Sequence, residues 1–93
     1  MKVAFTTSGW REYAHWAETD PSIIRKINGL IEECVRHPFK GTGKPEPLKQ
    51  ELQGYWSRRI DREHRLVYQV TGTGETQMLI IAQCMYHYEK RSK

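Results

Sequence analysis

The dipeptide Asp20-Pro21 divides the first part of the chain into two helices with almost no linker between them. Asp20 can accept hydrogen bonds from the free N–H groups at the start of a helix, and Pro21 has no N–H group to leave unpaired at the first helical position. The preceding segment, residues 9–19, carries apolar residues at the spacing of one helical face, which we expect to be buried. The members of this face are Trp10, Tyr13, Ala14 and Ala17.

The second helix has an apolar stripe that the first helix alone cannot cover. It is expected to end near Arg36, because His37 precedes Pro38 and a residue before proline disfavours helix. The two helices resemble an antiparallel hairpin whose combined apolar faces need a sheet against them. The stripe consists of Ile23, Ile27, Leu30, Ile31 and Cys34.

Four segments rich in β-branched and aromatic residues supply that sheet. The last of them is the most apolar, and we expect it inside the sheet. The predicted fold is a single α+β domain over residues 1–93, with the order βααβββ, a mainly antiparallel sheet and two helices packed on one face. The expected strands are residues 2–6, 55–60, 64–71 and 78–86.

Alternation along the third segment assigns its side chains to the two faces of the sheet. Leu66, Tyr68 and Val70 share one face, and Arg65 lies on the other. If the apolar face packs against the helices, Arg65 points to the opposite face, which we expect to be open.

The composition is that of an ordinary globular domain with a basic surface. Hydrophobic residues make up 38% and charged residues 28% of the 93 residues, enough for one modest core. Lys and Arg total 15 against 11 Asp and Glu, and the formal charge of +4 favours acidic partners such as RNA, DNA or an acidic protein. No segment approaches the roughly 18 apolar residues of a membrane span, so we expect a cytoplasmic protein with no membrane partner.

The cysteines and the glycine-rich loop argue against a metal or nucleotide cofactor. Cys34 and Cys84 stand in apolar surroundings without the close Cys or His spacing of a metal site, and we expect both as reduced core residues. The predicted loop at 39–54 contains Gly-Thr-Gly-Lys, but Pro45 follows the lysine where a phosphate-binding loop has Ser or Thr. We therefore expect no cofactor and no metal.

Polar residues between this loop and the chain end could support cleavage of RNA through its own 2'-hydroxyl. The reaction needs a base for the hydroxyl, an acid for the departing 5'-oxygen and cations for the charge that grows on the phosphate. Because arginine in a strand is usually solvated or ion-paired, the spacing alone also fits a basic RNA-binding module without catalysis. The candidates are Glu46 and His87 for proton transfer, Arg59, Arg65 and Lys49 for the phosphate, and Tyr88 for stacking on a base or orienting an oxygen.

Four motifs contain these candidates: GTGKPEPLK at 41–49, GYWSRRI at 54–60, EHRLVY at 63–68 and YHY at 86–88. Together with the aromatic residues of the first helix, they resemble the YoeB toxins of the RelE superfamily. The similarity extends over residues 1–88 with similar spacing. The chain departs from the family pattern in its longer turn at 72–77 and in the charged tail 89–93.

The resemblance implies the toxin of a type II toxin–antitoxin pair, a ribosome-dependent mRNA interferase. Such an endoribonuclease enters the ribosomal A site, cuts the mRNA there without a metal and inhibits translation. The resemblance gives Glu46 the role of general base, His87 that of general acid, and Arg65 that of stabilising the phosphorane-like transition state. The residues that assist or bind RNA would be Tyr88, Lys49, Arg59, Lys44 and Arg58.

The resemblance also implies partners and leaves one alternative within the superfamily. The partners are a YefM-like antitoxin with a disordered C-terminal segment, the 30S A site with its mRNA, operator DNA through the toxin–antitoxin complex only, and a second copy in a homodimer. The same fold also serves toxins that act on DNA gyrase. A gyrase toxin has no need for the catalytic set as a whole, namely Glu46, Arg65, His87 and Tyr88.

Overall fold

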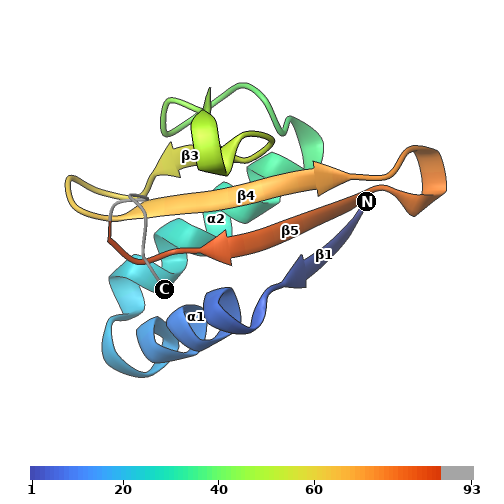
Figure 1. Ribbon diagram of the computed structural model, residues 1–93. Coiled ribbons are helices and arrows are strands. Elements are labelled where there is room, and N and C mark those ends of the chain that lie inside the picture. The colour runs from blue at the N-terminus through green and yellow to red at the C-terminus, as the bar shows by residue number, and fades with distance from the viewer. Residues whose placement is uncertain (87–93) are drawn as a thin grey trace.

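The structure is a computed structural model that describes residues 1–86, which form an α+β fold (Figure 1). The expected helices and strands are all present, and one short strand is added to them. In chain order the elements are β1 (Lys2–Phe5), α1 (Thr7–Thr19), α2 (Pro21–Arg36), β2 (Glu46–Pro47), the 3-10 helix η1 (Gln50–Leu52), β3 (Trp56–Arg59), β4 (Arg65–Thr71), the 3-10 helix η2 (Gly74–Thr76) and β5 (Met78–Gln83).

The five strands form one sheet in the order β1-β5-β4-β3-β2. β1 pairs with β5 in parallel, whereas the other neighbours are antiparallel, as predicted. In the view of Figure 1, α2 runs behind the sheet and α1 lies beside β5 and β1. The described part of the chain holds no helix long and apolar enough to cross a bilayer.

The added strand β2 corrects the expectation that residues 39–54 form a loop. Glu46 lies opposite Ser57 of β3, and Pro47 lies opposite Trp56. Proline lacks the N–H group that a strand between two neighbours needs, so the sequence around Pro47 does not read as a strand. A proline is tolerated here because β2 is the edge strand of the sheet.

The helix starts follow from capping side chains. The Asp20 carboxylate accepts two N–H groups in the first turn of α2, each at 3.2 Å, which confirms the predicted boundary. At the start of α1, the Thr6 hydroxyl accepts the N–H of Gly9 at 3.0 Å. Gly9 lies directly against the carbonyl oxygen of Ile81, where a β-carbon would collide with it. α1 can therefore sit close to β5 only with glycine at this position.

The core lies between α2 and the sheet. Both cysteines belong to it and carry free thiols, and burial raises the pKa of Cys84 to about 12. Trp10 was expected in the core, but it is 54% exposed and its ring packs on Phe5 at the surface, with ring centroids 5.7 Å apart. The buried cluster consists of Ile27, Leu30, Cys34, Ile60, Leu66, Tyr68, Leu79, Ile81 and Cys84.

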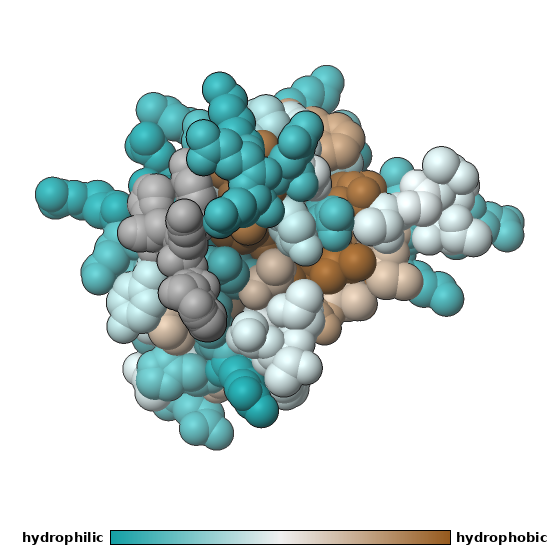
Figure 2. Space-filling model, in the orientation of Figure 1, coloured by the Kyte–Doolittle hydropathy of each residue, from teal (hydrophilic) through white to brown (hydrophobic). Residues whose placement is uncertain are grey.

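The sheet face opposite the helices, called here the distal face, is less open than the sequence suggests. Ser57 and Val67 point to it from neighbouring strands, and they are only 3% and 1% exposed. Hydrophilic side chains gather over the β3 side of the sheet, whereas hydrophobic ones show over the middle of β4 and β5 (Figure 2). In this view the hydrophilic side chains are thus most numerous towards the β3 side of the distal face.

Candidate functional site

Strand pairing brings three of the predicted site residues onto the distal face. Glu46 lies opposite Ser57 in the β2–β3 pair, and Arg59 lies opposite Arg65 in the β3–β4 pair. Residues that are opposite each other in a ladder, or two apart along a strand, point to the same face. Glu46 and Arg59 are exposed and Arg65 is half-buried. A carboxylate and two guanidinium groups therefore share one end of this face.

Arg65 is held by the turn that joins β3 to β4. Its Nη1 donates to the carbonyl oxygens of Asp61 at 2.8 Å and of His64 at 3.1 Å. A guanidinium carries five N–H donors, so Nη2 and Nε are the nitrogens that could bind a phosphate. The side chain is thus oriented before any ligand arrives.

The turn itself is stabilised by the Asp61 carboxylate. One of its oxygens accepts the backbone N–H groups of Glu63 at 2.9 Å and His64 at 2.8 Å. Partial burial opposes ionisation, but these two hydrogen bonds outweigh it and lower the pKa of Asp61. An ionised Asp61 therefore fixes the carbonyl groups that hold Arg65.

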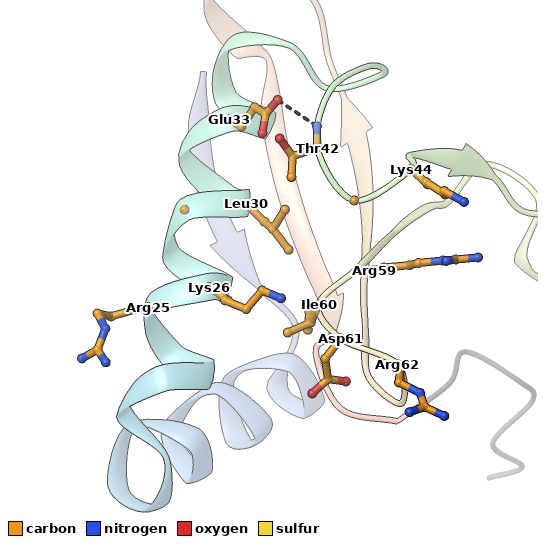
Figure 3. A pocket seen from close by; sticks show the side chains of 12 residues that line it. Arg25, Lys26, Leu30, Glu33, Thr42, Lys44, Arg59, Ile60, Asp61 and Arg62 are labelled. Atoms are coloured by element: carbon orange, nitrogen blue, oxygen red, sulfur yellow. Dashed lines mark hydrogen bonds between the residues drawn. The ribbon is translucent and has the colours of Figure 1, made fainter.

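A hollow lies beside the β3–β4 turn, and several cationic residues line it. This hollow of about 670 Å³ lies between α2, the loop at 42–44 and the turn at 59–62 (Figure 3). Leu30 and Ile60 line its apolar interior. Figure 3 shows that the side chains of Lys44, Arg59 and Arg62 point away from α2, to the same side of the molecule. These three residues contribute to the lining of the hollow, but their cationic ends extend out of it towards the surface around β2 and β3.

Lys49 lies near Glu46 at the edge of the sheet. A smaller hollow of about 270 Å³ is lined by residues of β2 and of the segment that follows it, including Glu46, Lys49 and Gln50. Lys49 is exposed, and Gln50 next to it has a left-handed backbone with a φ of 57°. Glu46 and Lys49 are therefore brought together by the tight path of the chain between β2 and η1.

Arg58 corrects the expectation that all the predicted cations contact RNA, because it is fully buried. Its guanidinium donates to three carbonyl oxygens of the segment between α2 and β2, at 2.6, 2.9 and 3.1 Å, and Nε donates to the Tyr68 hydroxyl at 3.1 Å. A carboxylate oxygen of Glu33 lies 3.6 Å from Nη1. Since these donors are used inside the protein, Arg58 anchors the loop and is not available to RNA.

Glu33 completes this anchor from α2. Its carboxylate accepts the N–H of Thr42 at 3.0 Å, as Figure 3 shows. The hydrogen bond from Thr42 and the charge of Arg58 lower the pKa of Glu33. The loop that leads into β2, and hence the place of Glu46, therefore depends on a buried arginine and a carboxylate of α2.

His87 and Tyr88, the predicted acid and its neighbour, lie outside the described residues. The residue before them, Tyr86, is described. Its carbonyl oxygen accepts the backbone N–H of Arg65 at 3.0 Å, and its N–H donates to Nδ1 of His64 at 2.7 Å. The contacts of His64 with Tyr86 and the support of Arg65 by the Asp61 carbonyl were not predicted, because they join residues whose spacing in the sequence carries no signal.

The described residues offer no alternative centre of metal chemistry. No group of three or more His, Cys, Asp or Glu side chains within residues 1–86 is arranged to hold a metal ion. The chemistry that this face can offer is therefore that of a carboxylate beside guanidinium and ammonium groups. Such a set can move a proton and bind a phosphate.

Comparison with known proteins gives a consistent result. A family model described as the YoeB-like toxin of bacterial type II toxin–antitoxin systems matches residues 5–88. The Toxin YoeB of Streptomyces coelicolor is 54% identical over 88 residues, which are 95% of this chain and 100% of that protein.

Solved structures of similar proteins have the same fold. A YoeB/ParE toxin from Agrobacterium tumefaciens superposes with a TM-score of 0.91 at 52% identity, covering 95% of this chain and 100% of the other. A YoeB dimer from Staphylococcus aureus gives a TM-score of 0.83 at 39% identity, covering 95% and 98%. The toxin in a heterotetrameric YoeB-YefM toxin–antitoxin complex from the same organism gives 0.82 at 39% identity, with the same coverage.

Proposed function

Because the chain belongs to the YoeB-like toxins of bacterial type II toxin–antitoxin systems, within the RelE superfamily, we propose that it is a ribosome-dependent endoribonuclease. It cleaves mRNA in the ribosomal A site and thereby inhibits translation. The observation that carries the proposal is the register of the sheet, which brings Glu46 to the face that holds Arg59 and Arg65. Toxins of this family are in general mRNA-cleaving enzymes, and this arrangement has the carboxylate and the cations that such cleavage needs.

The proposed reaction is an internal transfer at phosphorus without a metal. Glu46 takes the proton of the 2'-hydroxyl, whose oxygen attacks the adjacent phosphorus. The bond from phosphorus to the 5'-oxygen breaks, and His87 gives a proton to this leaving oxygen. The products are a 2',3'-cyclic phosphate and a free 5'-hydroxyl, so protons and bonds balance.

The cations act on the charge that builds up at phosphorus. Arg65 stabilises the transition state, because its guanidinium is already oriented by the carbonyl groups of the turn and presents a planar fork to two phosphate oxygens. Arg59 and Lys49 contact neighbouring phosphates, and Lys44 extends this basic path at the loop before β2. Tyr88 stacks on a base or orients an oxygen beside His87.

The proposed partners follow from the family. A YefM-like antitoxin binds the toxin through a segment that is disordered when free, and operator DNA is reached through this complex only. The solved Staphylococcus aureus proteins include both a YoeB dimer and a YoeB-YefM complex, which supports a homodimer and an antitoxin complex for this chain. The ribosome, with mRNA in its A site, supplies the substrate, and the reaction takes place in the cytoplasm.

The proposal is tested by toeprinting of translating ribosomes with the purified protein and with Glu46→Gln, which keeps the shape of the side chain and removes its basicity. We expect cleavage in the A site by the parent and about a 10²- to 10⁴-fold slower reaction in the variant. Glu75→Gln is the matched control, because Glu75 is exposed in η2 away from β2. No cleavage by the parent, combined with inhibition of DNA supercoiling by gyrase, would assign the chain to the gyrase toxins instead.

A further inference from the structure

Tyr86 has a backbone conformation that a bulky residue seldom adopts. Its φ of 61° lies in the left-handed region, which is sterically unfavourable for a side chain with a β-carbon. Such residues persist where the surrounding structure fixes them, and they are common next to functional sites. Tyr86 immediately precedes His87 in the sequence.

Two adjacent residues of the β3–β4 turn hold the backbone of Tyr86 on both sides. Nδ1 of His64 accepts its N–H at 2.7 Å, and the N–H of Arg65 donates to its carbonyl oxygen at 3.0 Å. The Tyr86 ring also packs on the His64 ring, with centroids 5.4 Å apart. Neither backbone hydrogen bond is part of a regular strand, because β5 ends at Gln83.

His64 is itself fixed before it meets Tyr86. It is only 8% exposed, and its backbone N–H donates to the Asp61 carboxylate at 2.8 Å. The edge of its ring meets the Trp16 ring at a centroid distance of 4.9 Å, and Nε2 lies 3.8 Å from a carboxylate oxygen of Glu63. The role of Nδ1 as acceptor for the N–H of Tyr86 requires that this nitrogen carries no proton.

The same residue also supports Arg65. The carbonyl oxygen of His64 accepts a hydrogen bond from Nη1 of Arg65 at 3.1 Å, while its ring holds the N–H of Tyr86 at 2.7 Å. The buried His64 therefore contacts both Arg65, whose guanidinium is proposed to stabilise the transition state, and Tyr86, which precedes His87 in the sequence.

We propose that His64 is a positioning residue for the reaction, and that it acts by holding Tyr86 in the left-handed conformation from which His87 and Tyr88 follow. This inference rests on the proposed endoribonuclease function, in which His87 is the acid. The feature that matters is the hydrogen-bond acceptor at the δ position of the side chain. A side chain of similar shape without that acceptor should leave the fold intact and misplace the acid.

The chain offers a matched pair of substitutions at this position. His64→Asn keeps an acceptor oxygen at the δ position, whereas His64→Leu has almost the same shape and no acceptor. We expect His64→Leu to lower the cleavage rate at saturating ribosome concentration by about 10- to 100-fold, since a displacement of about 1 Å is worth up to about 10² in rate. The ribosome concentration for half-maximal rate should stay within about threefold, and His64→Asn should recover most of the loss.

Hydrogen exchange at the amide of Tyr86, followed by NMR, gives a readout that does not depend on activity. We expect protection of this amide in the parent and in His64→Asn, and its loss in His64→Leu while the amides of β4 stay protected. Equal rates and equal protection in the Leu and Asn variants would overturn the positioning role. A parent chain that protects the Tyr86 amide but cleaves no mRNA would overturn the proposed function instead, and the positioning role with it.

If His64→Leu does not fold, a second pair of substitutions, at Tyr86, tests the same proposal. Tyr86→Gly tolerates a positive φ and keeps both backbone hydrogen bonds, whereas Tyr86→Pro has no N–H and a φ fixed near −65°. Both substitutions lie after the end of β5 at Gln83, outside the strands of the described sheet. We expect Tyr86→Pro to cleave at least about tenfold more slowly than Tyr86→Gly. Equal rates in the two variants would show that the conformation of Tyr86 does not place the acid.

Discussion

Arg58 and Arg59 are neighbours in the chain and have opposite roles. Alternation along β3 turns Arg58 towards the helices and Arg59 towards the distal face. Arg58 is fully buried and meets the carbonyl oxygens of the loop before β2, while Arg59 is exposed. The same side chain therefore stabilises the fold at one position and is free to bind an anion at the next.

Arg58→Met should destabilise the protein by about 3 to 5 kcal/mol, because it leaves the loop carbonyl groups and the Glu33 carboxylate without their buried cation. Urea unfolding followed by circular dichroism measures the change. Arg59→Met is the matched control and should shift the free energy of unfolding by about 0.5 kcal/mol or less, since Arg59 is exposed. A similar loss in both variants would contradict the anchoring role of Arg58.

Arg65→Lys tests whether geometry or charge is needed at the proposed transition-state position. Lysine keeps the charge but lacks the planar fork, because its donors lie on one nitrogen and cannot form two parallel bonds to a phosphate while a second nitrogen bonds the turn carbonyl groups. We expect cleavage of ribosome-bound mRNA to fall by about 10²- to 10³-fold at saturating ribosome concentration. Arg62→Lys, at an exposed turn position nearby, should cleave within about threefold of the parent. Parent-like cleavage by Arg65→Lys would reduce Arg65 to an electrostatic contact.

At the scale of elements, local signals predicted the helices and the main strands, and contacts between distant segments decided the rest. The cap at Asp20 and the alternation of β4 are readable because their partners lie within a few residues. β2 is not readable, since Pro47 belongs to a strand only by its pairing with β3. Alternation along β4 predicted that Arg65 lies on the distal face. The position of Glu46 on that face depends on the pairing of β2 with β3, which was not predicted.

Burial of single side chains was hard to predict for the same reason. An arginine in a strand is usually at the surface, and only the loop carbonyl groups 16 to 21 residues earlier in the chain make burial of Arg58 favourable. Trp10 fits the apolar face of α1 by its spacing, yet its ring packs on Phe5 at the surface and is 54% exposed.

The Asp61 carboxylate in the β3–β4 turn should make the free energy of unfolding depend on pH at low pH. The pKa of Asp61 is below its ordinary value of 3.8 in the folded state, so the unfolded chain binds more protons around that pH. The stabilisation is present above about pH 4 and is lost as pH falls through the folded pKa. We expect Asp61→Asn to have a lower free energy of unfolding than the parent at pH 7. The difference in free energy of unfolding between the two proteins should become smaller by pH 2. Urea unfolding between pH 2 and 7 measures this gap, and a gap that is constant with pH would contradict the assignment.

At the scale of the whole molecule, three cationic side chains gather at the β2–β3 end of the sheet. The formal charge is +4, and Lys44, Arg59 and Arg62 project together from the loop before β2, the end of β3 and the turn that follows it. Opposite-charge partners are attracted to such a surface, and an acidic segment that is disordered when free can cover it. RNA and antitoxin are therefore expected to compete for this surface, at least in part.

Inhibition by the antitoxin can be direct, by covering the cations, or indirect, by displacing the chain end that carries His87 and Tyr88. Chain ends have few neighbours, and Tyr86 is held mainly through His64 and Arg65. We expect a mixture in which displacement dominates. In that case, antitoxin binding exposes the Tyr86 amide to hydrogen exchange, and Arg59→Ala weakens antitoxin binding by less than about tenfold, as for a solvent-exposed ion pair.

Hydrogen exchange of the toxin with and without the antitoxin, together with the affinities of the parent and Arg59→Ala at two salt concentrations, separates the two routes. Added salt should weaken binding in the parent more than in Arg59→Ala, because the variant has lost one of the screened contacts. Arg11→Ala is a suitable control, since Arg11 is exposed on α1 away from β3. An unchanged Tyr86 amide combined with a large loss of affinity in Arg59→Ala would refute displacement, because the antitoxin would then act by occupying the cations alone.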